Sequence, residues 1–296
     1  MRFLISGATG FIGSELLTQA LAAGHEVRAL DRSVITGPVN TGPDAAPHPD
    51  LVTEVSWADV VVNLAGAPLT RLPWTKSYRA EIVRSRARVT TAIVQAILAS
   101  PTPPQALLSG SAVGYYGSRP GEILTEKSSA DTGFLAMTVR IWEAAARKAA
   151  PATRVVLLRT GMVLGPGGGA LAPLQLTTRL GLGTVIGSGS QFWPWISLED
   201  EVRAILHLAE AEVSGPVNLA APNPATAAEV AEELARQLRR PQLLRVPQWA
   251  ARTALGDAAD ELLLASQLMV PRVLLDSGFR FTHPQLAQAI AAALPQ

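Results

Sequence analysis

Cysteine is absent from this chain, and histidine, lysine and tyrosine are scarce. Without cysteine, the protein can form neither disulfide bonds nor cysteine-ligated metal sites. The four histidines lie far apart with no metal-ligand spacing, so we predict no metal site and expect each histidine to have a structural role. These histidines are His25, His48, His207 and His283.

Charge and long apolar runs are also limited. Only 17% of the 296 residues are charged, and the net charge of +1 comes without a basic run, so we predict no nucleic-acid partner. No segment offers the roughly 18 consecutive apolar residues of a membrane-spanning helix, and the N-terminus does not resemble a signal peptide. We therefore expect a cytoplasmic protein with no membrane partner.

The opening of the chain is an apolar strand that runs into a Gly-x-x-Gly-x-x-Gly turn. Gly7 can adopt the tight-turn backbone, Gly10 lets the main chain approach a ligand, and Gly13 lets the next helix pack closely. The N-terminus of that helix would then face phosphate groups. We expect this turn to bind a dinucleotide cofactor through residues Gly7, Thr9, Gly10, Phe11, Ile12 and Gly13.

The residues after the turn complete a strand-helix-strand unit, with a helix at 14–23 and a second strand at 26–30. Asp31 follows this strand, about 20 residues past the glycines, where an acidic side chain can accept hydrogen bonds from the adenosine ribose. Asp31 favours NAD(H), because a 2′-phosphate would meet a like charge. The adjacent Arg32 favours NADP(H), because a guanidinium can pair with that phosphate.

Strands and helices alternate through the first half of the chain. We predict strands at 59–66, 105–109 and 154–164, and helices at 75–99 and 134–150. This alternation predicts an α/β fold with a doubly wound parallel sheet of the Rossmann type. Residues 33–50 are expected to form a loop in place of a longer third strand, with Asp50 and Leu51 as candidate adenine contacts.

The composition of the chain changes at Pro166, which is followed by three consecutive glycines. We expect an NAD(P)-binding Rossmann domain at 1–165 and a smaller C-terminal α/β substrate lobe at 166–296. Part of 190–225 is expected to return to the Rossmann sheet, and an alanine-rich helix is predicted at 225–239.

Four motifs resemble the extended short-chain dehydrogenase/reductases of the NAD-dependent epimerase/dehydratase superfamily. They lie at residues 7–13, 63–66, 109–117 and 159–165. More narrowly, Trp142-Glu143 and the tail at 255–267 resemble an epimerase-like family whose bacterial members have often been labelled cell-division inhibitors. Nothing in these residues suggests how a filament protein would be bound, so that label is set aside. The resemblance implies an NADP(H) cofactor, with NAD(H) as the alternative, an undefined small-molecule substrate, and the homodimer common in the superfamily.

The superfamily transfers a proton through a tyrosine whose lysine partner lies four residues later, while a serine orients the substrate carbonyl. Ser111 matches the serine, but no Tyr-x-x-x-Lys occurs in the sequence. Leu135 and Val139 stand near the expected tyrosine and lysine positions, and neither can transfer a proton. The only three tyrosines are Tyr78, Tyr115 and Tyr116.

Two functions follow as alternatives. The first is an oxidoreductase or epimerase-like enzyme that uses Ser111, with Tyr115 or Tyr116 as a nonstandard proton donor. One or both tyrosines could instead have only a structural role, packing the segment that follows Ser111. The second is a dinucleotide-binding sensor that has lost catalysis. Further cofactor contacts are expected at strand ends and on the helix that follows, at Leu64, Ala65, Gly66, Arg86, Ser109, Arg159, Thr160 and Gly161.

Overall fold

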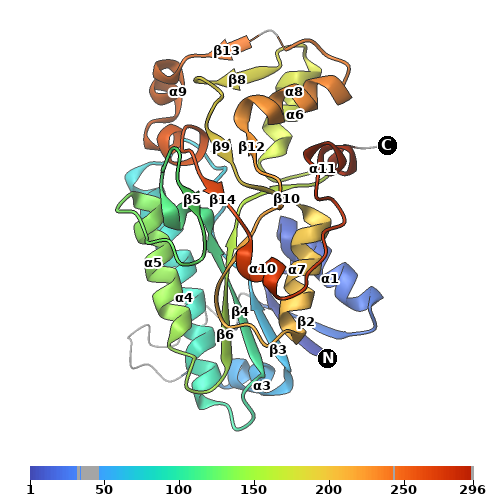
Figure 1. Cartoon of the computed structure of the whole chain (residues 1–296). Coiled ribbons are helices and arrows are strands. Elements are labelled where there is room, and N and C mark those ends of the chain that lie inside the picture. Colours follow the sequence, from blue (N-terminus) through green and yellow to red (C-terminus); the bar gives the residue numbers. More distant parts are fainter. Residues whose placement is uncertain (32–33, 35–46, 243, 295–296) are drawn as a thin grey trace.

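A parallel sheet of six strands forms the centre of the molecule in the computed structural model, which describes residues 1–31, 34, 47–242 and 244–294. The strand order is β11-β6-β4-β3-β1-β2, with every neighbouring pair parallel (Figure 1). Their bounds are β1 Arg2–Ser6, β2 Glu26–Leu30, β3 Val60–Asn63, β4 Ala106–Ala112, β6 Arg154–Thr160 and β11 Gly215–Leu219. The α/β fold of the Rossmann type that the sequence predicts is confirmed.

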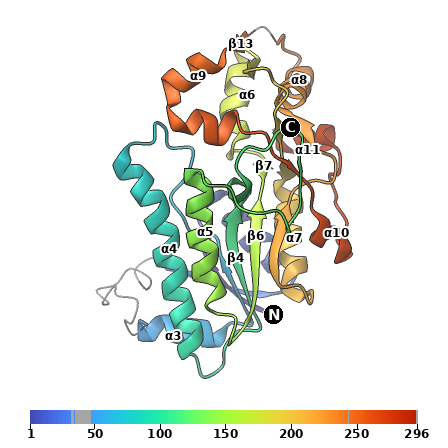
Figure 2. The ribbon, with the colours of Figure 1, turned by 60° about the vertical axis from the view of Figure 1, so that its left-hand side comes forward.

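Helices cover both faces of this sheet, as Figures 1 and 2 show. Helices α1 (Phe11–Ala22) and α7 (Leu198–Glu210) pack on one face. Helices α3 (Pro49–Trp57), α4 (Lys76–Ala99) and α5 (Phe134–Arg147) cover the other. Strands β1, β3, β4 and β6 are buried on both faces and are largely apolar, as parallel strands of this type are, whereas the edge strand β2 is largely exposed.

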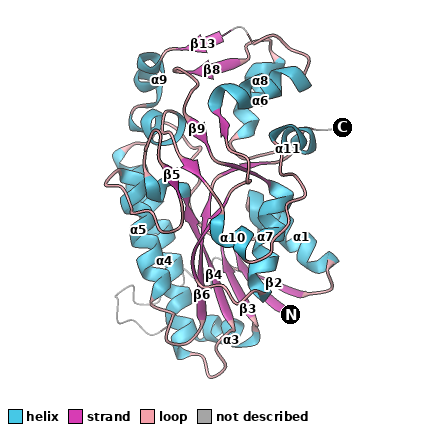
Figure 3. Cartoon of the chain, in the orientation of Figure 1, coloured by secondary structure: helices cyan, strands magenta, loops and turns pink. Residues whose placement is uncertain are grey.

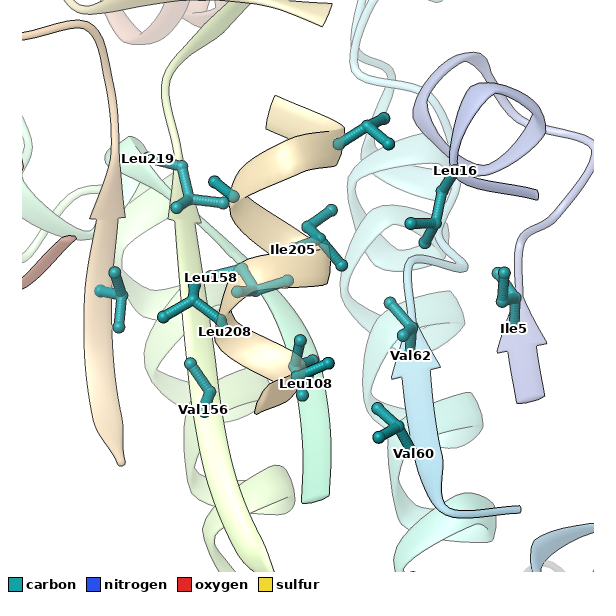
Figure 4. Close-up of a cluster of buried hydrophobic side chains, with 14 of the residues drawn as sticks. Ile5, Leu16, Val60, Val62, Leu108, Val156, Leu158, Ile205, Leu208 and Leu219 are labelled. Carbon is teal, nitrogen blue, oxygen red and sulfur yellow. The ribbon is translucent and has the colours of Figure 1, made fainter. Parts of the chain in front are cut away.

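Side chains alternate between two cores along each strand. In β6, Val156 and Leu158 face α7, and Figure 4 shows them beside Ile205 and Leu208 of that helix. Val155 and Leu157, one residue out of phase, face the opposite core under α4 and α5. The same alternation decides which way the polar residues at the strand ends point.

The rest of the chain builds a smaller upper part from short elements (Figure 3). A third core lies here, around Trp193, Trp195 and Leu234. The short strands pair as β7 (Met162–Leu164) with β10 (Trp195–Ser197), β8 (Thr184–Ile186) with β13 (Leu244–Val246), β9 (Phe192–Trp193) with β12 (Ala225–Thr226), and β5 (Ile123–Leu124) with β14 (Leu268–Met269). The helices are α6 (Leu171–Arg179), α8 (Ala227–Gln237), α9 (Gln248–Leu255) and α11 (Leu286–Ala293). Helix α10 (Arg272–Asp276) returns to the sheet, where Leu274 joins the core beneath α7.

Several element bounds differ from the sequence predictions. The predicted strand at 154–164 breaks at Gly161, where a Cβ would lie 2.5 Å from Pro194 O. Most of the predicted loop at 33–50 lies outside the described residues, and its last two residues belong to α3, which begins at Pro49. Strand β4 continues to Ala112, which brings Ser111 into the sheet. Within the described part of the chain, no helix has the length and apolar character needed to cross a bilayer.

Candidate functional site

The glycine turn at the end of β1 is packed so tightly that side chains cannot be accommodated. A Cβ on Gly13 would lie 2.1 Å from Gly7 O, and one on Gly7 would lie 2.9 Å from Leu64 C and Ala65 N. Gly7 also has a φ of +78°, which favours glycine. The turn and the end of β3 therefore form one continuous backbone cradle.

Helix α1 begins at this cradle without a cap of its own. Its N-cap is Gly10, and among the described residues no side chain caps the helix and its first turn holds no acidic residue. By contrast, Ser197 caps α7, whose first turn carries three acidic residues. The amide groups at the start of α1 can therefore bind an anion, which fits the pyrophosphate of a dinucleotide.

The residues predicted within the turn differ in their surroundings. Thr9 is exposed, while Ile12 and Phe11 are partly buried. Phe11 packs against the glycines that follow β7, because a Cβ on Gly168 would lie 2.6 Å from its ring. This contact joins the start of α1 to the upper part of the molecule.

The residues predicted to contact adenine and its ribose differ in their exposure. Asp31 is exposed directly after β2, while Arg32 lies outside the described residues. Asp50 lies in the first turn of α3 with its side chain 75% exposed. Leu51 is only 1% exposed and packs in the core beneath the sheet, so its predicted adenine contact is wrong for the side chain.

A buried polar network lies under residues 113–117, the segment after β4 that carries Tyr115 and Tyr116 and is called the catalytic loop below. The register of β4 and β6 sets Ser111 opposite Arg159, and both face Glu143 of α5. Ser111 Oγ donates to Glu143 Oε1 at 2.8 Å, and Arg159 binds the same carboxylate through Nε at 2.8 Å and Nη2 at 3.0 Å. Burial lowers the pKa of Arg159, but its hydrogen bonds and the charge of Glu143 outweigh burial and leave that pKa raised.

The two candidate tyrosines have different roles in this network. Tyr116 is fully buried; its hydroxyl accepts from Arg159 Nη1 at 3.0 Å and donates to Asn218 Oδ1 at 2.6 Å. Burial raises the pKa of Tyr116 to about 12. Tyr115 is partly exposed, and the Arg159 guanidinium carbon lies 3.5 Å from its ring centroid. Stacking of this kind is a cation–π interaction.

Two predicted cofactor contacts are corrected by their burial. Arg159 is 1% exposed, and its guanidinium is occupied by Glu143 and Tyr116, so it supports the site from below. Ser109 is 0% exposed within β4, which places its hydroxyl inside the core. Strand alternation points these two side chains into the fold, so a cofactor contact at either position remains a prediction for the main chain alone.

The other predicted contacts lie at the carboxyl ends of the strands. Gly66 is exposed, while Leu64 and Ala65 are partly exposed beside Gly7. Thr160 is partly exposed and donates to Glu201 Oε1 at 2.8 Å, and Gly161 packs against Pro194. These residues come together at one edge of the sheet, where open α/β folds bind ligands.

Leu135 and Val139 occupy the face of α5 that turns toward the catalytic loop. Leu135 is 5% exposed and Val139 is 3% exposed. A Cβ on Gly114 would lie 2.9 Å from Leu135 Cβ, so the loop packs directly on this apolar surface. The helix therefore presents no proton-transfer group from these two positions.

The sequence analysis did not anticipate three acidic residues of the site. Glu143 appeared only as part of a family motif, although its buried carboxylate organises the network. Glu126 Oε1 accepts hydrogen bonds from the main-chain amides of Asn218 and Val273, which connects the segment after β5 to β11 and α10. Glu201 is fully buried on α7. In the sequence, Glu143 and Glu201 each stand at a helix position where the periodicity predicts an apolar residue, and this is the signal that could have identified them.

Comparisons with known proteins agree over nearly the whole chain. The model of the NAD dependent epimerase/dehydratase family matches residues 3–220, and a domain of unknown function, DUF1731, matches residues 246–293. An epimerase family protein of Mycobacterium bovis is 39% identical over 297 residues, covering 98% of this chain and 96% of that protein. Epimerase family protein SDR39U1 of Bos taurus is 38% identical, covering 98% of each chain. The crystal structure of human SDR39U1 with NADPH has a TM-score of 0.88 at 33% identity and covers 99% of each chain.

Proposed function

The chain belongs to the NAD-dependent epimerase/dehydratase family, and from this premise we propose that it is an NADP(H)-binding oxidoreductase acting on a small molecule. The observation that carries the proposal is the backbone cradle formed by Gly7, Gly13 and the end of β3, with the uncapped start of α1 beside it. A pyrophosphate can accept hydrogen bonds from those amides. Residues 1–165 would hold the nucleotide, and residues 166–296 would cover the substrate.

NADP(H) is preferred over NAD(H) in this proposal. Its support is the human relative, whose structure contains NADPH, together with the arginine at position 32 of the sequence. Asp31 is the opposing feature, because its carboxylate would repel a 2′-phosphate. A neighbouring arginine can compensate for that repulsion through charge-assisted hydrogen bonds.

Tyr115 is the residue that we propose moves a proton at the substrate oxygen. When bound, the nicotinamide supplies or accepts a hydride, and a proton must then move at oxygen. Tyr115 is partly exposed, whereas the hydroxyl of Tyr116 already has two partners in the interior. The Arg159 guanidinium lies against the Tyr115 ring in a cation–π contact, which holds that ring in place.

Ser111 would act differently from the serine that the resemblance implies. Its hydroxyl hydrogen is donated to Glu143, so only its lone pairs remain for a ligand. Ser111 would therefore accept a hydrogen bond from a substrate hydroxyl and would not donate one to a carbonyl. Glu143 fixes this orientation because its carboxylate, paired with Arg159, can only accept.

Parallel titrations of the nucleotide-free protein with NADPH and NADH, followed by nucleotide fluorescence, test the proposal. We expect NADPH to bind at least about tenfold more tightly, a difference of about 1.4 kcal/mol. Tighter binding of NADH would mean that Asp31 controls the pocket. No binding of either nucleotide would overturn the proposed function.

A dinucleotide-binding sensor without catalysis is the second candidate. The observation that favours it is the apolar pair Leu135 and Val139, buried where the superfamily's tyrosine and lysine are expected. The sensor would bind NADPH tightly but transfer no hydride to any of a panel of carbonyl compounds and alcohols. It would also behave as wild type after Ser111→Ala, whereas the enzyme would lose turnover.

A further inference from the structure

A cavity of about 430 Å³ lies at the loop between β3 and α4, outside the cofactor cradle and the polar network. The loop and the first two turns of α4 line it together. The lining residues are Arg71, Leu72, Pro73, Thr75, Ser77, Tyr78 and Glu81. A cavity of this size can hold a small molecule.

Hydrogen bonds from side chains fix the loop in place. The main-chain carbonyl groups of residues 67, 68 and 69 each accept one. Their donors, in the same order, are Arg86 Nη1 at 3.0 Å, Tyr78 Oη at 2.7 Å and Trp74 Nε1 at 3.0 Å. The Trp74 ring also meets the Phe134 ring edge-on at the start of α5, with 5.6 Å between the centroids. A ligand would therefore enter a preformed cavity, and its binding would require little ordering of the loop.

Arg71 gives the cavity a positive charge. Its guanidinium carbon lies 5.1 Å from the centroid of the Tyr78 ring, and no carboxylate among the described residues forms an ion pair with it. Glu81 is the acidic residue of the lining, but Arg84 Nη2 binds its carboxylate at 2.6 Å and offsets its charge. The first turn of α4 contains no acidic residue, so the positive end of the helix dipole adds to the charge of Arg71. The cavity therefore favours an anionic group.

Apolar and hydroxyl groups lie next to this charge. Leu72 is 37% exposed at the cavity, and the hydrogen bond of the Tyr78 hydroxyl to the loop holds the Tyr78 ring in position. Ser77 Oγ lies 3.0 Å from Thr75 Oγ1, which accepts from the amide of Tyr78. An anion bound to Arg71 would thus have hydroxyl groups and an aromatic ring beside it.

We propose that this cavity binds a small acidic molecule in which a phosphate or carboxylate group is joined to a flat apolar group. The anion pairs with Arg71, and the apolar group packs on Tyr78 and Leu72. The loop that lines the cavity follows β3 directly, and Arg79 of α4 forms an ion pair with Asp257 of the C-terminal part. The inference goes beyond the binding of NADP(H) and does not require it. It makes acidic molecules of this class the first to screen as substrates.

Calorimetric titrations of the nucleotide-free protein with two acids, phenyl phosphate and benzoate, test the proposal. Methyl phosphate lacks the ring and benzyl alcohol lacks the charge, so these two compounds serve as controls. We expect at least one of the acids to bind at least about tenfold more tightly than either control. Arg71→Met should weaken the binding of that acid at least about tenfold. Arg240→Met, which removes an exposed arginine between α8 and β13, should bind it as the wild type does.

The other outcomes overturn the inference. They are no binding of either acid, an equal affinity for a control compound, an unchanged affinity in Arg71→Met, and an equal loss in Arg240→Met. Saturating NADPH should leave the affinity for the acid within about twofold, whereas competition between the two would place the acid in the cofactor cradle. A protein that binds no NADPH would refute the proposed function, and the titrations with the acids would still decide what the cavity binds. If Arg71→Met does not fold, Arg71→Gln takes its place, with the same expected loss.

Discussion

Glu201 is predicted to make the stability of the protein depend on pH. This residue is fully buried on α7, where Oε1 accepts from Thr160 and Oε2 has no hydrogen-bond partner among the described residues. Burial raises the pKa of Glu201 to about 8 from 4.5, while the Thr160 hydrogen bond lowers it by less. The folded protein therefore holds a proton on Glu201 at pH values where the unfolded chain has lost it.

The sign and size of the effect follow from proton linkage. Below pH 4.5 Glu201 is protonated in both the folded and the unfolded protein, so its ionisation does not lower the free energy of unfolding. Between pH 4.5 and about 8 the free energy of unfolding falls by about 1.4 kcal/mol per pH unit, and the loss levels off near 5 kcal/mol above this range. At pH 7 the expected cost is about 3 kcal/mol, which is a large share of a typical domain's stability.

Glu201→Gln isolates this cost, because the amide keeps an acceptor for Thr160 and cannot ionise. Urea unfolding of the two proteins between pH 5 and 8.5 should give nearly equal stabilities at pH 5 and an advantage for Glu201→Gln that grows by several kcal/mol toward pH 8. Glu199→Gln, in the exposed part of the same helical turn, serves as the control. A constant difference between wild type and Glu201→Gln across this range would refute the reasoning.

Three further predictions concern the candidate site. Gly13→Ala should abolish NADPH binding in fluorescence titration, because its Cβ would lie 2.1 Å from Gly7 O and open the cradle; wild-type affinity would mean that the cradle does not bind the nucleotide. Tyr115→Phe should lower any hydride-transfer rate by about 10²-fold or more, with little effect on stability. Tyr116→Phe should mainly lower the melting temperature, because it removes two buried hydrogen bonds. If the two variants showed the reverse effects, Tyr116 would be the residue that transfers the proton. Glu143→Leu should lower the free energy of unfolding, measured with denaturant, by about 3–5 kcal/mol, because Arg159 would remain charged and unpaired in the core. A decrease below about 1 kcal/mol would mean that water reaches Arg159.

The fold could be predicted because its signals are local. Apolar strands buried on both faces and the glycine turn each occupy a few consecutive residues, so their physical requirements are visible in the sequence. Helix 75–99 was predicted almost to the residue, and α4 spans Lys76–Ala99. The predicted strand at 154–164 was too long because Gly161 meets Pro194, a contact between residues that the sequence does not place together.

The polar network could not be predicted, because its partners are far apart in the chain. Ser111 and Glu143 are 32 residues apart, and Tyr116 and Asn218 are 102 apart. Successive side chains point to opposite faces of a strand, so whether a side chain at the strand end contacts a ligand or the core depends on the exact residue at which the strand ends. That uncertainty explains why Arg159 and Ser109 were expected at the cofactor, although strand alternation buries both.

The arrangement of charge at this site bears on how the protein can work without a Tyr-x-x-x-Lys pair. The positive charges that remain near the catalytic loop come from elsewhere: Arg159 from beneath Tyr115, and Arg86 from α4 beside Gly66. One is neutralised by Glu143 and fixes the geometry of Ser111, while the other has no acidic partner among the described residues. Neither arginine can lose its proton near neutral pH, so an enzyme built on this site would move the proton through Tyr115. Removal of that hydroxyl would then distinguish an enzyme from a sensor.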